Sequence, residues 1–156
     1  MVKQMNIRKV KIEDYEEVVK LYKELWDAEK IFDLNMKQEY KVSDKQKKII
    51  QKRIKSRKSI FLVAEENKKV VGLIDGYIIE DSNYIEKVGY LDNLCVSKNN
   101  RKQGISTKLI EEFIKIMKRK NVSYLKLNAF ENNTPAINLY KKLGFEEHSI
   151  YYTKKI

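Results

Sequence analysis

The segment from Tyr90 to Lys120 constrains the fold most, because a strand, a glycine-containing turn and a helix follow one another in it without a gap. Its last part carries apolar residues at the spacing of one buried helix face, namely Ile105, Leu109, Phe113 and Ile116. The first amides of a helix have no carbonyl partner, and together with the helix dipole they attract an anion. Gly104 allows a close approach of the backbone, and Arg101 and Lys102 add positive charge. The segment therefore predicts a site for a ligand that carries phosphate.

The turn reads Arg101-Lys-Gln-Gly104-Ile-Ser106, and it resembles the pyrophosphate-binding signature of the GNAT superfamily of N-acetyltransferases. That signature is Arg or Gln, two residues, Gly, one residue, and then Gly or Ala. Ser106 departs from it at the sixth position, where its hydroxymethyl group either crowds the phosphates or adds a hydrogen-bond donor. The placement of the turn between a strand and a helix strengthens the resemblance.

A second stretch, from Asn133 to Phe145, is similar to the second CoA-binding motif of the same family, with an Asn, an Ala and a Leu-Tyr pair that ends in Leu-Gly-Phe. The stretch also reads as a short helix with clear ends. Thr134 suits the N-cap, Pro135 the first helical position, and Gly144 the left-handed residue after the last turn.

The resemblance implies that the chain binds acetyl-CoA and moves the acetyl group to a primary amine by direct attack in a ternary complex. It places the pyrophosphate on six residues, which are Arg101, Lys102, Gln103, Gly104, Ile105 and Ser106. The pantetheine arm pairs with the preceding strand at Leu94, Cys95 and Val96, and the backbone N–H of Leu94 becomes the oxyanion donor. Asn133 and Asn138 match positions that hydrogen-bond CoA, although a helix-entry residue and a surface polar residue need no such role.

Tyr140 matches the family's general acid, because a phenol with a reference pKa of about 10 returns a proton to a departing thiolate and stays protonated at neutral pH. The alternative is a core aromatic on a helix. Many family members carry a Glu where this chain has Tyr90, so we expect Asp92, directly or through water, to act as the base. Strand side chains alternate with period two, which places Asp92 on the same side as Tyr90, towards the acceptor. A structural hydrogen-bond acceptor is the other interpretation of Asp92.

The acceptor is predicted to meet the connection between the first two helices, which in the family helps to form the acceptor site. This connection carries acids that suit a cationic amine, at Asp27, Glu29 and Asp33. Surface ion pairs with the basic helix that follows are the alternative role of these acids. Several acceptors remain open, namely a small amine, a polyamine, an aminoglycoside, a peptide N-terminus and a lysine. A homodimer also remains open.

A chain of 156 residues with 42% apolar residues is large enough for one core, so residues 1–156 are predicted to form one domain, and the resemblance implies that it is an N-acetyltransferase domain. No apolar run approaches the ~20 residues that span a bilayer, and the first residues lack the apolar stretch of a signal peptide, so we expect no membrane partner and a cytoplasmic protein. Cys95 is the single cysteine and His148 the single histidine, which leaves no cluster for zinc. We interpret both as buried strand residues.

The net charge of +11 is concentrated between Lys41 and Lys58, where nine Lys or Arg residues accompany one Asp. Such a segment raises the question of nucleic acid. Of the 33 basic residues only five are Arg, however, and no aromatic residue lies between Val42 and Ser59. We therefore interpret the segment as a solvated helix face and do not expect nucleic acid, with RNA or an acidic partner as the alternative.

The order of elements predicts a mixed α/β fold, with a mostly antiparallel sheet splayed at its centre and helices on both faces. Strands are expected at Met5–Lys11, Ser59–Glu65, Val70–Glu80, Lys87–Val96, Ser123–Ala129 and Phe145–Thr153. Helices are expected after Glu13, after the capping box formed by Ser43 and Gln46, and after the turn at Gly104.

Two other classes of function remain open from the sequence. The missing Glu at position 90 permits a CoA-binding regulator without turnover. The basic segment permits an RNA-directed protein, either a binding module or an acetyltransferase that acts on charged tRNA.

Overall fold

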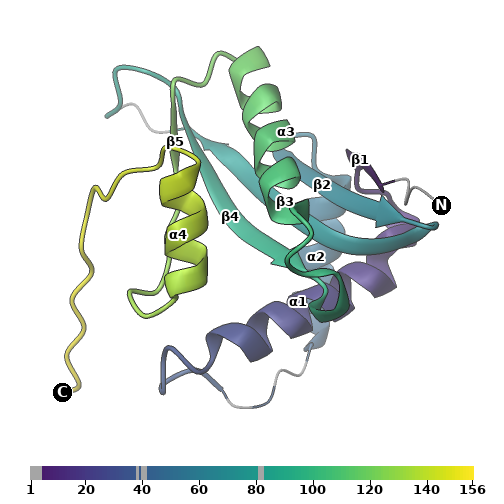
Figure 1. The fold of residues 1–156 in the computed structure, drawn as a ribbon, viewed down its shortest axis with the longest axis horizontal. Coiled ribbons are helices and arrows are strands. Elements are labelled where there is room, and N and C mark those ends of the chain that lie inside the picture. The colour runs from purple at the N-terminus through teal and green to yellow at the C-terminus, as the bar shows by residue number, and fades with distance from the viewer. Residues whose placement is uncertain (1–4, 38, 40–41, 81–82) are drawn as a thin grey trace.

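The computed structural model describes residues 5–37, 39, 42–80 and 83–156 (Figure 1). Its strands are β1 (Met5–Lys9), β2 (Ser59–Glu66), β3 (Lys69–Ile79), β4 (Val88–Val96) and β5 (Tyr124–Lys126). Its α-helices are α1 (Tyr15–Glu29), α2 (Asp44–Lys55), α3 (Ile105–Arg119) and α4 (Thr134–Lys142), and 3-10 turns lie at η1 (Ile12–Asp14) and η2 (Lys98–Asn100).

Within the described residues the strands form one sheet in the order β1-β2-β3-β4-β5. The first four strands are antiparallel to their neighbours, and β5 runs parallel to β4. The β4–β5 pairing covers Val88–Tyr90 against Tyr124–Lys126, so β4 continues beyond it to Val96 with no strand of the described residues on that side. The predicted mixed, mostly antiparallel sheet that opens at its centre is confirmed.

The core lies in two layers, one on each face of the sheet. Leu109, Ile110 and Phe113 of α3 pack on one face, against Leu62, Ile74 and Leu91. On the other face α1 and α2 bring Val18, Leu21, Ile50 and Ile54 against Phe61, Leu73 and Cys95. Figure 1 shows α3 and α2 on opposite sides of the sheet. The helical spacing of these apolar residues is what gives each helix one buried stripe.

Several predicted boundaries are confirmed because they rest on local chemistry. The capping box starts α2, where Ser43 Oγ accepts from the Gln46 amide at 3.2 Å and Gln46 Oε1 accepts from the Ser43 amide at 2.9 Å. The β2–β3 turn carries Asn67 and Lys68 with φ values of 51° and 63°. Cys95 is buried within β4, as expected.

The N-cap of α4 was assigned to the wrong residue. Asn133 takes that position, and its Oδ1 accepts from the Ala136 amide at 3.3 Å. Thr134 is therefore the first helical residue, with Pro135 after it. The helix has no use for a second capping oxygen one residue later. Gly144 adopts φ of 84° after the last turn, as predicted.

The prediction of strands from Phe145 to Thr153 is wrong, since residues 145–156 form no regular structure. His148 is accordingly exposed instead of buried. The strand predicted at Ser123–Ala129 shortens to β5, whose three residues offer little edge for a further strand to pair with. No helix within the described residues combines the length and the apolar character that a bilayer crossing requires.

Candidate active site

The turn before α3 has the geometry of an anion site. Gly104 is the N-cap with φ of 76°, and apart from its two chain neighbours no atom of the described residues lies within 4 Å of the place where a Cβ would sit. Lys102 also has a positive φ, of 60°. The space above Gly104 is thus open to a ligand. The first amides of α3 point into this space, and the N-cap supplies no side chain to accept their hydrogen bonds. Arg101, Lys102 and Gln103 are exposed around it.

The Arg101 side chain ties this turn to β4, because its Nε donates to the Val96 carbonyl at 3.0 Å. Ile105 is buried under α3 and anchors the helix, while Ser106 is half-buried at its first turn. The turn therefore sits at the end of the same strand edge, Leu94 to Val96, that β5 leaves unpaired. The anion site and the open edge are continuous.

The Cys95 thiol is buried and unsuited to a reactive role. Its Sγ donates to the Leu21 carbonyl at 3.3 Å, and burial raises the pKa of the thiol to about 12. A thiol with so high a pKa is a poor nucleophile at neutral pH. Its side chain is therefore not available to a ligand on the open edge, and in the register with Leu73 its backbone N–H and carbonyl face β3.

Tyr140 lies on α4 and is largely enclosed. Its ring meets that of Phe145 edge-on, with 5.8 Å between centroids. Burial, and then the Glu29 carboxylate, raise the pKa of the Tyr140 phenol to about 12. The phenol thus stays protonated at neutral pH and can donate a proton. Asn138 is exposed on the same helix. The side-chain oxygen of Asn133 accepts the hydrogen bond that caps α4.

Asp92 belongs to a cluster of charged and polar residues that the sequence reasoning missed. The Arg53 guanidinium contacts Asp92 Oδ2 at 2.6 Å and Asp75 Oδ1 at 3.0 Å. The Tyr22 hydroxyl and the Asn93 amide also donate to Asp75. Burial raises the pKa of Asp75, and the Arg53 charge opposes that shift. The cluster joins α1, α2, β3 and β4.

A β-bulge builds this cluster. Asp75 pairs with Asn93, but the next residue, Gly76, pairs with Leu91, which leaves Asp92 as an extra residue in β4. A bulge of this kind interrupts strict alternation. Asp92 and Asn93 are adjacent in sequence, yet both reach the Asp75–Arg53 pair.

The three acids predicted to meet the acceptor have different surroundings. Asp27 bonds to Lys23 at 2.7 Å and to Lys30 at 3.0 Å, and these lysines lower its pKa. Asp33 Oδ1 accepts from the Asn35 amide at 2.9 Å. Within the described residues the Glu29 carboxylate has no hydrogen bond or ion pair, and burial raises its pKa. Of the three acids, Glu29 is therefore the one whose carboxylate is not already held by a hydrogen bond or ion pair within the described residues.

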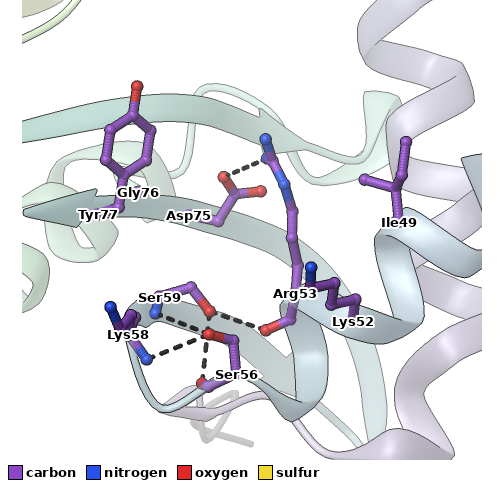
Figure 2. A pocket seen from close by; sticks show the side chains of 9 residues that line it. All are labelled: Ile49, Lys52, Arg53, Ser56, Lys58, Ser59, Asp75, Gly76 and Tyr77. Atoms are coloured by element: carbon purple, nitrogen blue, oxygen red, sulfur yellow. Dashed lines mark hydrogen bonds and ion pairs between the residues drawn. The ribbon is translucent and has the colours of Figure 1, made fainter.

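A pocket of about 370 Å³ opens between α2 and β3 beside the cluster (Figure 2). In Figure 2 Arg53 reaches across it towards Asp75, and Tyr77 forms a wall. The Tyr77 ring lies 5.6 Å from that of Tyr90, between centroids, so the pocket adjoins the β4 face that carries Asp92. The hydroxyls of Ser56 and Ser59 are used by the loop itself, since Ser59 Oγ donates to the Arg53 carbonyl at 2.8 Å and Ser56 Oγ accepts from the Lys58 amide at 3.1 Å.

Comparison with known proteins identifies the family of this chain. The model of the Acetyltransferase (GNAT) family matches residues 15–145, which include the anion turn, the open strand edge and α4. The chain belongs to the GNAT family. An N-alpha-acetyltransferase of Sulfurisphaera tokodaii is 36% identical over 101 residues, which make up 60% of either chain. The chain spans less than two thirds of the length of that relative and of N-acetyltransferase 8 from Homo sapiens, which is 30% identical over 94 residues.

Solved structures share the GNAT fold over nearly the whole chain. A tetramutant of the BH1408 protein from Bacillus halodurans superposes with a TM-score of 0.87 at 21% identity, covering 97% of this chain and 99% of that one. The aminoglycoside N-acetyltransferase AAC(6')-Iy in complex with CoA gives 0.78 at 20% identity, covering 100% and 98%. At such identities the likeness concerns the fold.

In this GNAT domain the predicted site residues fall into two groups. The residues around Gly104, which the sequence predicts to bind the cofactor, lie next to the edge of β4 that β5 leaves unpaired. Asp92 and Tyr90 lie with the Arg53 cluster and the Tyr77 wall. The signal for the cluster was present in the sequence, since Asp75 is the one acid within the apolar run of β3 and Arg53 lies three residues after the buried Ile50.

Proposed function

We propose that the chain is an acetyl-CoA-dependent N-acetyltransferase that acetylates a primary amine by direct attack in a ternary complex. The observation that carries the proposal is the junction of an open strand edge with a glycine-capped helix start, in a chain of the GNAT family. Such a junction offers a backbone slot for an amide-containing arm and an anion site for its phosphates.

The residues fit the cofactor in two ways. The empty space above Gly104 would admit a pyrophosphate to the amides of Ile105 and Ser106, with Lys102, Gln103 and the remaining guanidinium nitrogens of Arg101 around it. Leu94 and Val96, whose amides face away from β3, would pair with the pantetheine arm on either side of Cys95, and Asn138 is exposed on α4. Acetyl-CoA would supply an activated thioester at the carbonyl to be attacked.

The chain's own groups then have distinct tasks. The Leu94 N–H stabilises negative charge on the carbonyl oxygen, a contact whose loss in other enzymes lowers the rate by about 10² to 10³. Asp92 takes the proton that the amine loses as its nitrogen bonds to carbon, directly or through water. Tyr140 would give its proton to the sulfur as the carbon–sulfur bond breaks, and solvent would carry the proton held by Asp92 back to the Tyr140 phenolate, which leaves amide and thiol as products and restores both groups.

The acceptor is proposed to be a small-molecule amine, a protein N-terminus or a lysine. The proteins named above include an N-alpha-acetyltransferase and an aminoglycoside N-acetyltransferase, which supports an amine acceptor but not one kind of amine. Tyr90 would lie beside the amine, and Asp27, Glu29 and Asp33 would favour a cationic acceptor. Glu29 is the strongest of the three, because its carboxylate has no partner in the described part of the chain.

The test has two steps. Acetyl-CoA should raise the melting temperature, because a ligand at 100 times its dissociation constant adds about 2.7 kcal/mol of stability, whereas NAD and ATP should do much less. A panel of amines should then release CoA thiol, detected with DTNB. No thermal shift at millimolar acetyl-CoA would refute the cofactor assignment. A shift without thiol release from any amine would leave a CoA-binding protein without turnover.

A further inference from the structure

Arg53 is the hub of the polar cluster on the acceptor side of the sheet. One of its terminal nitrogens lies 3.0 Å from Asp75 Oδ1 and the other lies 2.6 Å from Asp92 Oδ2. The Asp75 side chain is 2% exposed, whereas those of Arg53 and Asp92 are 36% and 29% exposed. The guanidinium thus connects a carboxylate in the core to one at the surface of the site.

The buried end of the cluster is saturated. Both oxygens of Asp75 accept hydrogen bonds, from Tyr22, Asn93 and Arg53, and these donors come from α1, β4 and α2. A buried carboxylate held on several sides has little freedom to turn. Because a guanidinium is planar and its nitrogens are fixed relative to one another, an anchored first nitrogen also fixes the second.

The exposed end is half open. Asp92 Oδ2 meets Arg53, while Oδ1 has no hydrogen-bond partner in the described parts of the chain. That free oxygen lies on the extra residue of the bulge, on the face where the Tyr77 and Tyr90 rings contact each other at a tilt. A carboxylate held by one oxygen and open at the other can receive an ammonium or a water in one defined direction.

We propose that Arg53 is a positioning residue for acetyl transfer, which holds Asp92 Oδ1 towards the acceptor amine by clamping Oδ2 against the buried Asp75. The role rests on the proposed function, in which Asp92 takes the amine proton. Arg53 itself touches neither donor nor acceptor in this role. Its effect should therefore pass through Asp92 alone.

A double-mutant cycle on the acceptor's kcat/KM tests this dependence. Arg53→Gln should lower kcat/KM at least ~10-fold when Asp92 is present, and less than ~2-fold in the Asp92→Asn background, because groups that act as one unit are not additive. The acetyl-CoA dissociation constant, measured by calorimetry, should stay within ~2-fold of the wild-type value in every variant, as affinities of independent sites do. Lys55→Gln is the matched control, since it removes one positive charge from an exposed position of the same helix, two residues away.

Folding is controlled separately. Arg53→Gln leaves Asp75 buried without its cation, which destabilises proteins, so a thermal melt accompanies each variant. Arg53→Lys keeps a positive charge next to Asp75 but cannot bridge two carboxylates as a planar guanidinium does. If Arg53→Gln does not fold, Arg53→Lys takes its place in the cycle, with the same non-additive loss expected.

The outcomes separate this proposal from the function on which it rests. A wild-type protein without thiol release from any amine refutes the proposed function and this role with it. An active wild type in which Arg53 and Asp92 variants lose kcat/KM additively overturns the positioning role alone. Full kcat/KM in the folded Arg53→Lys variant overturns it as well.

Discussion

The Tyr140 phenol is the group on which the proposed chemistry makes its most specific demand. Its ring packs against Phe145, and its pKa is raised by burial and by Glu29, so it is protonated over the whole neutral range. A half-buried phenol of this kind stays protonated at neutral pH, and its raised pKa also makes it a weaker acid than a free phenol. The role of its hydroxyl can therefore be tested separately from the packing of its ring.

Tyr140→Phe should keep the packing and remove the proton. Loss of a positioned general acid lowers kcat by about 10² to 10⁴, whereas loss of one neutral hydrogen bond to the cofactor weakens binding about tenfold at most. Single-turnover kinetics should show the first effect, and acetyl-CoA affinity should be nearly normal. A wild-type single-turnover rate in Tyr140→Phe would exclude the acid role, and weaker binding at an unchanged rate would make Tyr140 a cofactor contact.

Single residues also mark the limit of the sequence reasoning. Gly104 and Arg101 could be placed because a turn between a strand and a helix is a local structure, written in adjacent residues. Arg53 was read as part of a solvated basic face, because its partners Asp75 and Asp92 lie 22 and 39 positions further along the chain. Long-range pairs of this kind depend on which helix face meets which strand.

At the scale of elements, the start of α3 and the end of α4 make a natural pair for comparison. Gly104 and Gly144 have φ values of 76° and 84°, and a Cβ on either would meet nothing within 4 Å in the described part of the chain beyond its neighbours in sequence. The same substitution at both positions therefore carries a similar backbone strain. What differs is the helix end, which is the amide end at Gly104 and the carbonyl end at Gly144.

Gly104→Asp should abolish the thermal shift caused by acetyl-CoA and leave a folded protein, because a carboxylate would occupy the space and repel the charge of the phosphates. Gly144→Asp should lose a similar amount of stability without ligand and keep the shift. Thermal melts with and without acetyl-CoA measure both quantities. An unchanged shift in Gly104→Asp would make the turn a helix start and nothing more.

The strands show the same division between what is local and what is not. The β2–β3 hairpin and the capping box of α2 follow from neighbouring residues and were predicted. The bulge at Asp92 was not, since its cause is the register between β3 and β4. The closing strands were predicted from a Tyr-rich segment and from the resemblance, and neither supplies the partner that a strand needs.

For the molecule as a whole, the net charge of +11 makes individual acids important to stability. Asp14 is the clearest case, because it lies buried where β1 leads into α1 and accepts two hydrogen bonds from Arg8 at 2.8 Å. Arg8 also reaches Glu65 on β2. The cluster thus connects the first strand, the first helix and the second strand.

Stability should depend on pH through this acid. The Arg8 hydrogen bonds, assisted by the Lys11 amide and opposed by burial, lower the pKa of Asp14. Its contribution is then complete above the unfolded pKa of about 3.9 and is lost as the pH falls through the lower folded value. Urea unfolding should show Asp14→Asn to be less stable than wild type at neutral pH, with the difference shrinking towards about pH 3.

Asp44→Asn is the matched control for this titration, since the Asp44 side chain is 90% exposed and its lysine contact is solvated. Its effect on the free energy of unfolding should be small at every pH, as for exposed ion pairs in general. A difference between Asp14→Asn and wild type that does not change with pH would show that Asp14 acts through shape or capping and not through its charge.

The seclusion of Cys95 has a practical consequence. Since it is the chain's one cysteine and its sulfur is directed at the Leu21 carbonyl under α1, the folded protein should be silent to thiol-specific dyes. Colour developed in a DTNB assay would then count released CoA without a background from the enzyme. The rate at which Cys95 is labelled should therefore report local opening, because the dye reaches the thiol only when α1 separates from the sheet. That rate should fall when a bound ligand stabilises the closed domain.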